Sequence, residues 1–193
     1  VADSAAEIPL SDVRVGMITD SDIPVVRIAK DAAETIVREA QRSLDGLETG
    51  GVLLGVDLGG DISVLHAGGP GPDAKREPTR FLRDTAHAAE VAMAAWQEDR
   101  SQWIGEWHTH PTGNLSPSPI DLESYLRHLA DPELHLDRFL SLILSTSQAG
   151  PSLAVAWLIY QSHLTAVPIQ TLDPRCSVVA MPESQSGPAK TKE

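Results

Sequence analysis

The stretch GEWHTHPTGNLSPSPID, residues 105–121, places two histidines one residue apart at the end of an apolar segment. In a β-strand, side chains i and i+2 point to the same face of the sheet. His108 and His110 would therefore share one face, and Trp107 would point to the other. Two imidazoles at this spacing can reach one metal ion with Zn–N bonds of about 2.0–2.1 Å. The chain is thus constrained to form a strand that ends at a polar site and is followed by a helix.

A third metal ligand must come from outside the histidine pair, and Asp121 is the best candidate. It is expected in the first turn of the following helix, where the PTGNLSPSP loop can return it to the strand end. Two histidines and one carboxylate leave a fourth position for water, which is the layout of catalytic zinc. A structural interpretation is also open, with Ser118 as N-cap, Pro119 at the first helical position and Asp121 completing a capping box. The two interpretations are compatible, because Ser118 can cap the helix and still donate its hydroxyl proton.

Metal-assisted hydrolysis also needs a general base, and no HExxH motif supplies one. Glu48 lies in ETGG, where Gly50 and Gly51 permit tight backbone geometry. Taken alone, Glu48 is better explained as an exposed carboxylate beside a helix end. Glu106 is a rival base, since it precedes His108 by two residues and would share its face of the strand.

The remaining histidines fit a metal site less well. His128 would share a helix face with Asp121 but lie about 10.5 Å further along the axis, too far to bind the same ion. The other four are interpreted as surface or core residues, namely His66, His87, His135 and His163.

Hydrophobic periodicity predicts a mixed sheet flanked by helices, an α/β or α+β layout. Helices are predicted at 31–44, 84–99 and 119–131, and strands at 24–30, 51–56, 62–68, 102–110, 138–146, 152–160 and 164–172. The segment 69–80 is predicted as a loop because Pro and Gly disfavour regular structure. Asp31 is the candidate N-cap of the first helix, and Asp84 or Thr85 that of the second.

The first predicted helix should bury one stripe of apolar residues. That stripe comprises Ala33, Ile36, Val37, Ala40 and Leu44.

Three segments are predicted along the chain: a loose N-terminal segment over 1–23, one domain over 24–172, and a disordered tail over 173–193.

Charge and cysteine content narrow the classes of function. A formal net charge of −12 argues against a nucleic-acid binder and against an anionic membrane surface as partner, and it favours a basic protein partner or none. Cys176 is the single cysteine, which excludes an internal disulfide and a cysteine zinc cluster. No apolar run approaches the roughly 20 residues of a membrane helix, and the acidic start lacks the features of a signal peptide. These observations together predict a cytoplasmic protein.

The motifs ETGGVLLG, GEWHTHP and SPSPID together resemble the JAMM metalloproteases, also called the MPN-plus domain. The family pattern is an upstream Glu, then His-x-His, seven residues, Ser, two residues and Asp. Here it falls on Glu48, His108, His110, Ser118 and Asp121, and the resemblance covers about residues 25 to 165. The motifs look most like bacterial JAB proteins encoded near ubiquitin-activating-like and conjugating-like enzymes, some of them in antiphage defence operons.

The resemblance implies a cytidine-deaminase-like sandwich with a mixed central sheet. It implies that His108, His110 and Asp121 bind one zinc ion with a water, and that Glu48 rather than Glu106 is the general acid and base. Ser118 would hydrogen-bond the developing oxyanion or the water.

The implied reaction is hydrolysis of a peptide or isopeptide bond after the C-terminal Gly of a bacterial ubiquitin-like modifier, in deconjugation or in precursor maturation. The implied partners are the modifier, its conjugates and the activating-like and conjugating-like enzymes. The segments that follow His110 and Ala130 are short, so the insertions with which eukaryotic relatives grip ubiquitin are expected to be absent. Two alternatives stay open: a processing protease for a ThiS/MoaD-type sulfur carrier, and a non-catalytic MPN scaffold.

Overall fold

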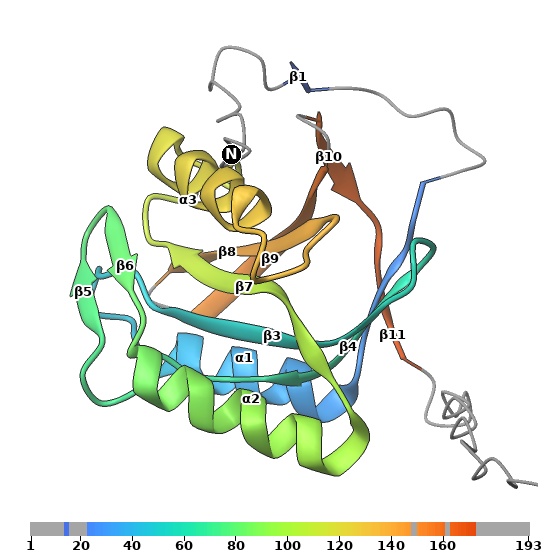
Figure 1. Ribbon diagram of the computed structural model, residues 1–193. Helices are drawn as coiled ribbons and strands as arrows, with labels where there is room; N and C mark the ends of the chain where they lie inside the picture. Colours follow the sequence, from blue (N-terminus) through green and yellow to red (C-terminus); the bar gives the residue numbers. More distant parts are fainter. Residues whose placement is uncertain (1–13, 16–22, 148–149, 161–162, 173–193) are drawn as a thin grey trace, which may run out of the picture.

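A computed structural model describes residues 14–15, 23–147, 150–160 and 163–172 of the chain. Within these residues, nine strands form one mixed sheet in the order β1-β10-β9-β8-β7-β3-β4-β2-β11 (Figure 1). The strands are β1 Arg14–Val15, β2 Val26–Ile28, β3 Gly50–Asp57, β4 Ile62–Ala67, β7 Gln102–His110, β8 Phe139–Ser147, β9 Gly150–Tyr160, β10 His163–Val167 and β11 Ile169–Thr171. A separate hairpin joins β5 Lys75–Glu77 to β6 Arg80–Leu82.

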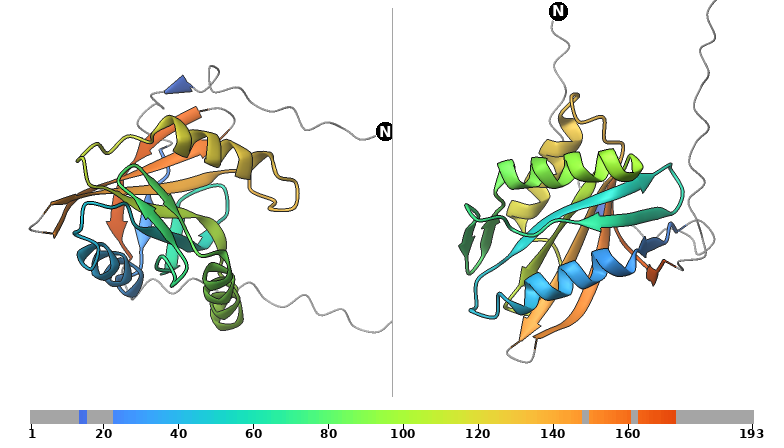
Figure 2. Two further views of the ribbon diagram at one scale, coloured as in Figure 1. Left: turned by 90° about the vertical axis from the view of Figure 1, so that its left-hand side faces the viewer. Right: turned by 90° about the horizontal axis from the view of Figure 1, so that it is seen from below.

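Helices cover both faces of this sheet. Helix α1 (Lys30–Gln41) covers one face, whereas α2 (Thr85–Asp99) and α3 (Pro119–Ala130) lie on the other, so that β3 and β4 run between α1 and α2 (Figure 2). Helix α1 packs against β4 and β9, α2 against β3 and β7, and α3 against β8. The predicted mixed sheet flanked by helices is therefore confirmed.

Strand β7 lies inside the sheet, parallel to β8 and antiparallel to β3. Its register with β3 shifts beside Leu53 and Leu54, so that Ile104 is an extra residue on the β7 side. Such a bulge changes which face the following side chains meet. Ile104 and Trp107 consequently both join the core beneath α1, whereas Trp103 packs with the residues of the α3 side.

Trp107 confirms that the two faces of β7 differ in character. Its side chain is fully buried in the core on the α1 side, and its Nε1 donates a hydrogen bond of 2.8 Å to the Gly68 carbonyl. It thus points away from the face that carries the histidines, as the sequence predicted.

The predicted loop over 69–80 was wrong in its second half. Residues 75–77 and 80–82 form the β5–β6 hairpin around the two-residue turn Pro78-Thr79. Proline suits the first central position of a type I or II turn because its φ is already fixed near −65°. The Pro that seemed to exclude regular structure therefore helps to make the hairpin.

The predicted strand over 164–172 is divided by Pro168, which has no backbone N–H to donate to a ladder. Strand β10 pairs with β9 before this proline, and β11 pairs with β2 after it. The Pro168 carbonyl accepts a 2.9 Å hydrogen bond from Val26 N, which starts that second pairing.

Helix α1 also differs from its prediction. Its N-cap is Ala29, without a side-chain cap, because the helix starts before Asp31 and places that carboxylate inside the first turn. The helix ends at Gln41, so Leu44 lies beyond it and is 38% exposed. The buried stripe is rotated toward Ala32, and Val37 is 40% exposed.

Helix α2 begins as predicted. The Asp84 side chain accepts hydrogen bonds from the backbone N–H groups of Ala86 and His87. The backbone turns after Asp99 at Arg100, whose φ of 66° is left-handed, and this turn leads directly into β7.

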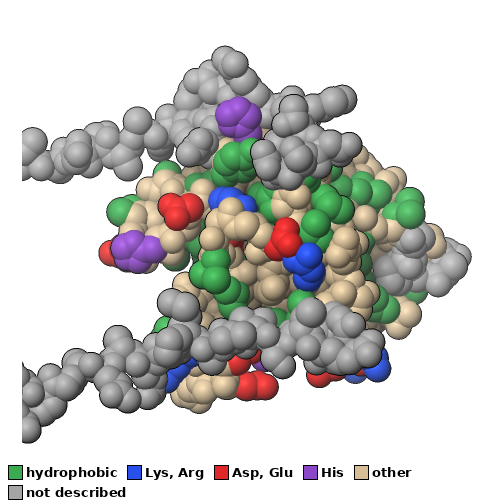
Figure 3. Space-filling model, turned by 90° about the vertical axis from the view of Figure 1, so that its right-hand side faces the viewer, with side chains coloured by type: hydrophobic (Ala, Val, Ile, Leu, Met, Phe, Trp, Pro, Cys, Tyr) green, Lys and Arg blue, Asp and Glu red, His purple; other side chains and the backbone are tan. Residues whose placement is uncertain are grey.

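The terminal segments predicted over 1–23 and 173–193, and Cys176, lie largely or wholly outside the described residues. Within the described residues, Arg14 and Val15 pair in parallel with β10, and no helix is long and apolar enough to cross a membrane. On the face shown in Figure 3, acidic side chains lie beside Lys and Arg rather than gathering together.

Candidate metal centre

Three side chains converge where β7 meets the start of α3. His108 and His110 come from the end of β7 and Asp121 from the first turn of α3, and one ligand atom from each lies within 4.8 Å of the others. The two Nε2 atoms are 3.0 Å apart, and each is 3.7 Å from Asp121 Oδ2. Ligands at about 2.0–2.1 Å from a tetrahedral zinc would be about 3.3–3.4 Å apart. The cluster is therefore of the size that could hold a metal ion.

His110 is held in the tautomer that a ligand requires. Its Nδ1 lies 2.6 Å from the Asn114 carbonyl oxygen, which can only accept a hydrogen bond. Nδ1 therefore donates, and the Nε2 lone pair is left facing the cluster. The loop that supplies this carbonyl is tied to the sheet, since Trp157 Nε1 donates to the Leu115 carbonyl at 2.7 Å.

Asp121 takes part in the cluster and in a helix cap at the same time. Asp121 N donates to Ser118 Oγ at 3.2 Å, and Ser118 N donates to Asp121 Oδ2 at 2.7 Å, which completes a capping box with Pro119 at the start of the helix. The cap and the cluster thus coexist, as the sequence allowed. The cap fixes the direction in which the carboxylate points.

The two carboxylates considered as bases lie in different surroundings. Glu48 lies two residues before the start of β3, is 7% exposed, and has Oε1 3.9 Å from His110 Nε2. It is therefore not the exposed carboxylate that its local sequence favoured. Glu106 shares the face of the histidines, as predicted, but forms an ion pair with Arg83, whose guanidinium also stacks over Trp103.

Burial and neighbouring charges shift the ionisation of these groups. Burial raises the pKa of Glu48, although the two imidazoles oppose the shift. Burial alone would raise the pKa of Asp121 as well, but His108, His110 and Ser118 hold it well below its ordinary value. For His110, burial lowers the pKa, but interactions with Asp121, the Asn114 carbonyl and Glu48 outweigh it and raise the pKa.

A pocket of about 220 Å³ opens beside the cluster, with Glu48, Glu106, His108 and Asp121 in its lining. One wall comes from β6 and the start of α2, and the other from α3. The wall residues are Phe81, Leu82, Arg83, Thr85, Ser124 and His128. Ser118 is not part of this lining. The sequence missed the first wall because the hairpin was interpreted as a loop, and the wholly charged strand Lys75–Glu77 carries no hydrophobic alternation that would have found it.

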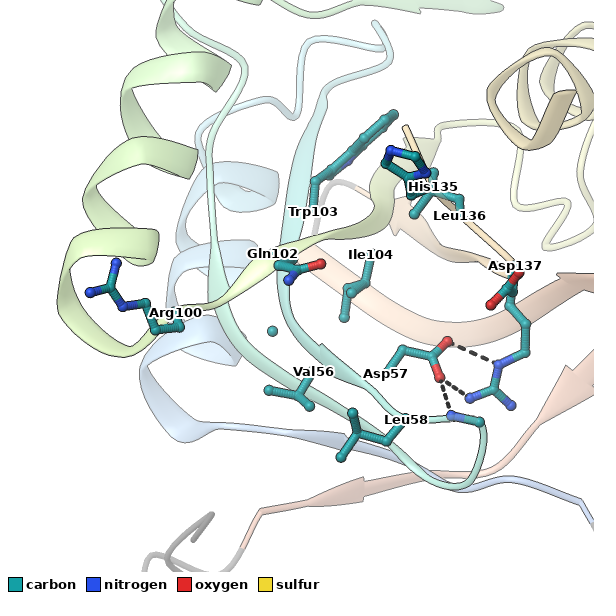
Figure 4. A pocket seen from close by; sticks show the side chains of 13 residues that line it. Val56, Asp57, Leu58, Arg100, Gln102, Trp103, Ile104, His135, Leu136 and Asp137 are labelled. Atoms are coloured by element: carbon teal, nitrogen blue, oxygen red, sulfur yellow. Dashed lines mark hydrogen bonds and ion pairs between the residues drawn. The ribbon is translucent and has the colours of Figure 1, made fainter. Parts of the chain in front are cut away.

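A larger hollow of about 440 Å³ lies near the opposite end of β7, where Trp103, Ile104 and Leu136 are among the residues around it (Figure 4). Arg138 in this hollow is bound by Asp57 and by the Gly60 carbonyl. No member of the metal cluster lines it. The smaller pocket is the better candidate site because it holds the ligand cluster and the buried Glu48.

The other histidines lie outside the cluster. His128 reaches the pocket but packs against Phe139 and the edge of Trp103, so it is not one of the three ligands. His66 contacts Asp99 at 2.8 Å, a pair 33 residues apart that local sequence does not reveal.

A family model described as prokaryotic homologs of the JAB domain matches residues 29–165 of this chain. A protein of Pseudomonas aeruginosa strain BWHPSA011 / Pa011 named CD-NTase/cGAS isopeptidase is 32% identical over 110 residues, which cover 56% of this chain and 70% of that protein. A protein of the same name from Escherichia coli strain TW11681 is 30% identical over 118 residues, which cover 60% of this chain and 75% of that protein.

Solved structures also resemble the fold. A protein of Desulfitobacterium hafniense superimposes with a TM-score of 0.56 at 20% identity, over 77% of this chain and 93% of the other. A protein of Salinibacter ruber strain DSM 13855 superimposes with a TM-score of 0.50 at 23% identity, over 77% of this chain and 92% of the other. At these identities the likeness shows a shared fold alone.

Proposed function

The chain belongs to the family of prokaryotic JAB-domain homologues, the bacterial branch that its JAMM-like motifs resemble, and we propose that it is a zinc-dependent isopeptidase. The observation that carries this proposal is the buried His108–His110–Asp121 cluster with the buried carboxylate of Glu48 beside it. The names of the similar proteins support an isopeptide bond as substrate. We propose that the bond joins a CD-NTase/cGAS-type protein to its target.

The donor set favours zinc. Two imidazole nitrogens and one carboxylate oxygen make a three-ligand site that keeps one position open, as catalytic zinc sites do. A zinc ion held there would polarise the scissile carbonyl and lower the pKa of a water toward about 7. The protein's part is to keep His110 in the ligating tautomer through Asn114 and to aim Asp121 through the capping box.

Glu48 is the general base in this proposal. Its carboxylate would take a proton from the attacking water and pass it to the leaving amine, which a raised pKa favours. Glu106 is a poorer candidate because its carboxylate is already engaged in an ion pair with Arg83. Ser118 would donate its hydroxyl proton to the developing oxyanion, since its Oγ accepts only the Asp121 N–H within the cap.

The pocket favours a slender substrate. A volume of about 220 Å³ between the β5–β6 hairpin and α3 suits an extended chain end with a small terminal residue. This supports cleavage after a glycine-like carboxyl terminus. A ubiquitin-like modifier, a defence role, a cytoplasmic location and the sulfur-carrier alternative stay predictions.

The test compares wild type with Glu48→Gln. The substrate is a CD-NTase-family protein joined through its carboxyl terminus to a lysine side chain of an acceptor. Glu48→Gln should bind one zinc per chain and lower kcat by about 10²–10⁴-fold. Glu98→Gln, an exposed substitution on α2, is the matched control. Full cleavage by Glu48→Gln, or by metal-free wild type, would refute the proposal.

A further inference from the structure

We propose that Arg76 of the β5–β6 hairpin is a positioning residue that holds Glu48 in place beside the metal cluster. The inference rests on the proposed function, because it assigns Arg76 a role in the reaction that Glu48 performs. Arg76 does not line the pocket, and it lies 28 residues from Glu48 in the sequence. Its role follows from the contacts of its guanidinium with the segment 45–48.

The Arg76 guanidinium binds this segment at three residues. Nη1 and Nη2 donate to the two carboxylate oxygens of Asp45 at 3.0 and 2.9 Å. Nε donates to the Glu48 carbonyl at 3.1 Å, and Nη2 also reaches the Leu47 carbonyl at 3.3 Å. A planar guanidinium can make this set of directed bonds, whereas a lysine ammonium cannot reproduce it.

The hairpin backbone adds one further bond to the same segment. Glu48 N donates to the Glu77 carbonyl at 2.9 Å, so residues 76 and 77 together engage both backbone polar groups of Glu48. Asp45 in turn accepts from Leu47 N at 3.2 Å, which shapes the turn that leads to Glu48. Arg76 also holds the pKa of Asp45 below its ordinary value, in keeping with a bidentate pair.

The position of Glu48 explains why such a contact is needed. Thr49, on its carboxyl side, is fixed to β7, since Thr49 N donates to Thr109 Oγ1 at 3.0 Å and Thr109 N donates to the Thr49 carbonyl at 2.8 Å. On its amino side the chain is a connection between α1 and β3 rather than part of the sheet. Arg76 supplies the second anchor there, so the base is fixed from both directions.

The hairpin consequently has two roles at the site. Phe81 and Leu82 on β6 form a pocket wall, and Arg76 on β5 holds the base. A substrate that presses on this wall therefore acts on the same element that positions Glu48.

The kinetic test uses Arg76→Gln, with Arg80→Gln on the exposed part of the same hairpin as the charge-matched control. Misplacing a reacting group by about 1 Å can cost 10²-fold, so Arg76→Gln should lower kcat by about 10- to 100-fold. KM and zinc content should stay close to wild type, because neither the wall nor the ligands change. Arg76→Lys should recover part of the loss, and adding Asp45→Asn to Arg76→Gln should cost little more.

Amide hydrogen exchange tests the positioning without any substrate. Peptides covering residues 45–49 should exchange faster in Arg76→Gln than in Arg80→Gln, while peptides of β7 stay protected. Unchanged exchange, an unchanged kcat, or a loss confined to KM would each overturn the inference. If zinc-loaded wild type fails to cleave the isopeptide substrate, the proposed function fails, and the exchange result still decides whether Arg76 holds the segment.

Discussion

Replacing Ser118 by alanine separates its two proposed roles, because they differ in energy. In the capping box the Ser118 side chain accepts one hydrogen bond from Asp121 N, while the reciprocal bond runs from the Ser118 backbone N–H to Asp121 Oδ2 and does not use the Ser118 side chain. Ser118→Ala therefore removes one cap bond and leaves the other. Losing an N-cap side chain costs about 1 kcal/mol of folding free energy, within a range of about 0.5–2.

The catalytic role predicts a larger effect on rate than on stability. Removing one oxyanion donor lowers kcat by about 10²–10³, which corresponds to about 2.7–4 kcal/mol in the transition state. For a chain of this size, the lost cap bond should lower Tm by only about 2–4 °C per kcal/mol. Ser118→Thr keeps both the hydroxyl donor and the cap acceptor, so it should stay close to wild type in Tm and in kcat.

The assay measures zinc per chain, Tm and kcat on the same preparations of wild type, Ser118→Ala and Ser118→Thr. A Ser118→Ala enzyme that keeps its zinc and loses less than about tenfold in kcat would show that Ser118 is a helix cap alone. A variant that loses its zinc would show that the hydroxyl acts by aiming Asp121. Either result would refute the oxyanion assignment.

Three further predictions concern the charges of the site. Glu106→Gln should keep most of the cleavage activity but lower Tm, because it leaves the partly buried guanidinium of Arg83 without its carboxylate partner. A loss of kcat as large as that of Glu48→Gln would instead show that Glu106 is the general base. Zinc affinity, measured by competition with a chelator, should fall as the pH drops through the raised pKa of His110, because the ligand must be deprotonated; an affinity constant from pH 8 to pH 5 would contradict this. With a net charge of −12, the chain should bind a basic partner less tightly as salt rises, and binding unchanged between low and physiological ionic strength would exclude that charge attraction.

Local patterns were sufficient to predict the elements that carry the cluster. Strand β7 was predicted at its observed bounds because a strand places side chains i and i+2 on one face, which puts the two histidines on one side and Trp107 on the other. The start of α3 was predicted from Ser118, Pro119 and Asp121, since a capping box is a contact among neighbours in sequence. These two elements set the spacing of the ligand cluster.

The contacts that join distant segments could not be predicted in the same way. Arg76 and Asp45 are 31 residues apart, and no pattern in the sequence around either residue indicates that they form a contact. The burial of Glu48 likewise depends on the hairpin and on β7, which are remote in the chain. The local sequence shows only a carboxylate near glycines. The catalytic role of Glu48 was therefore predicted from the family resemblance, and the pocket that it lines became visible only in the fold.

The bulge at Ile104 determines how a site of this kind can diversify. Because side chains alternate along β7, one residue inserted or deleted after the bulge would turn His108 and His110 toward the core occupied by Trp107. Evolution is therefore restricted to substitutions within the strand. Loops accept changes of length more readily than strands do, and the connection from β7 to α3, residues 111–118, lies outside the sheet. New substrate preferences should arise by lengthening that connection, while the strand register that places the ligands stays unchanged.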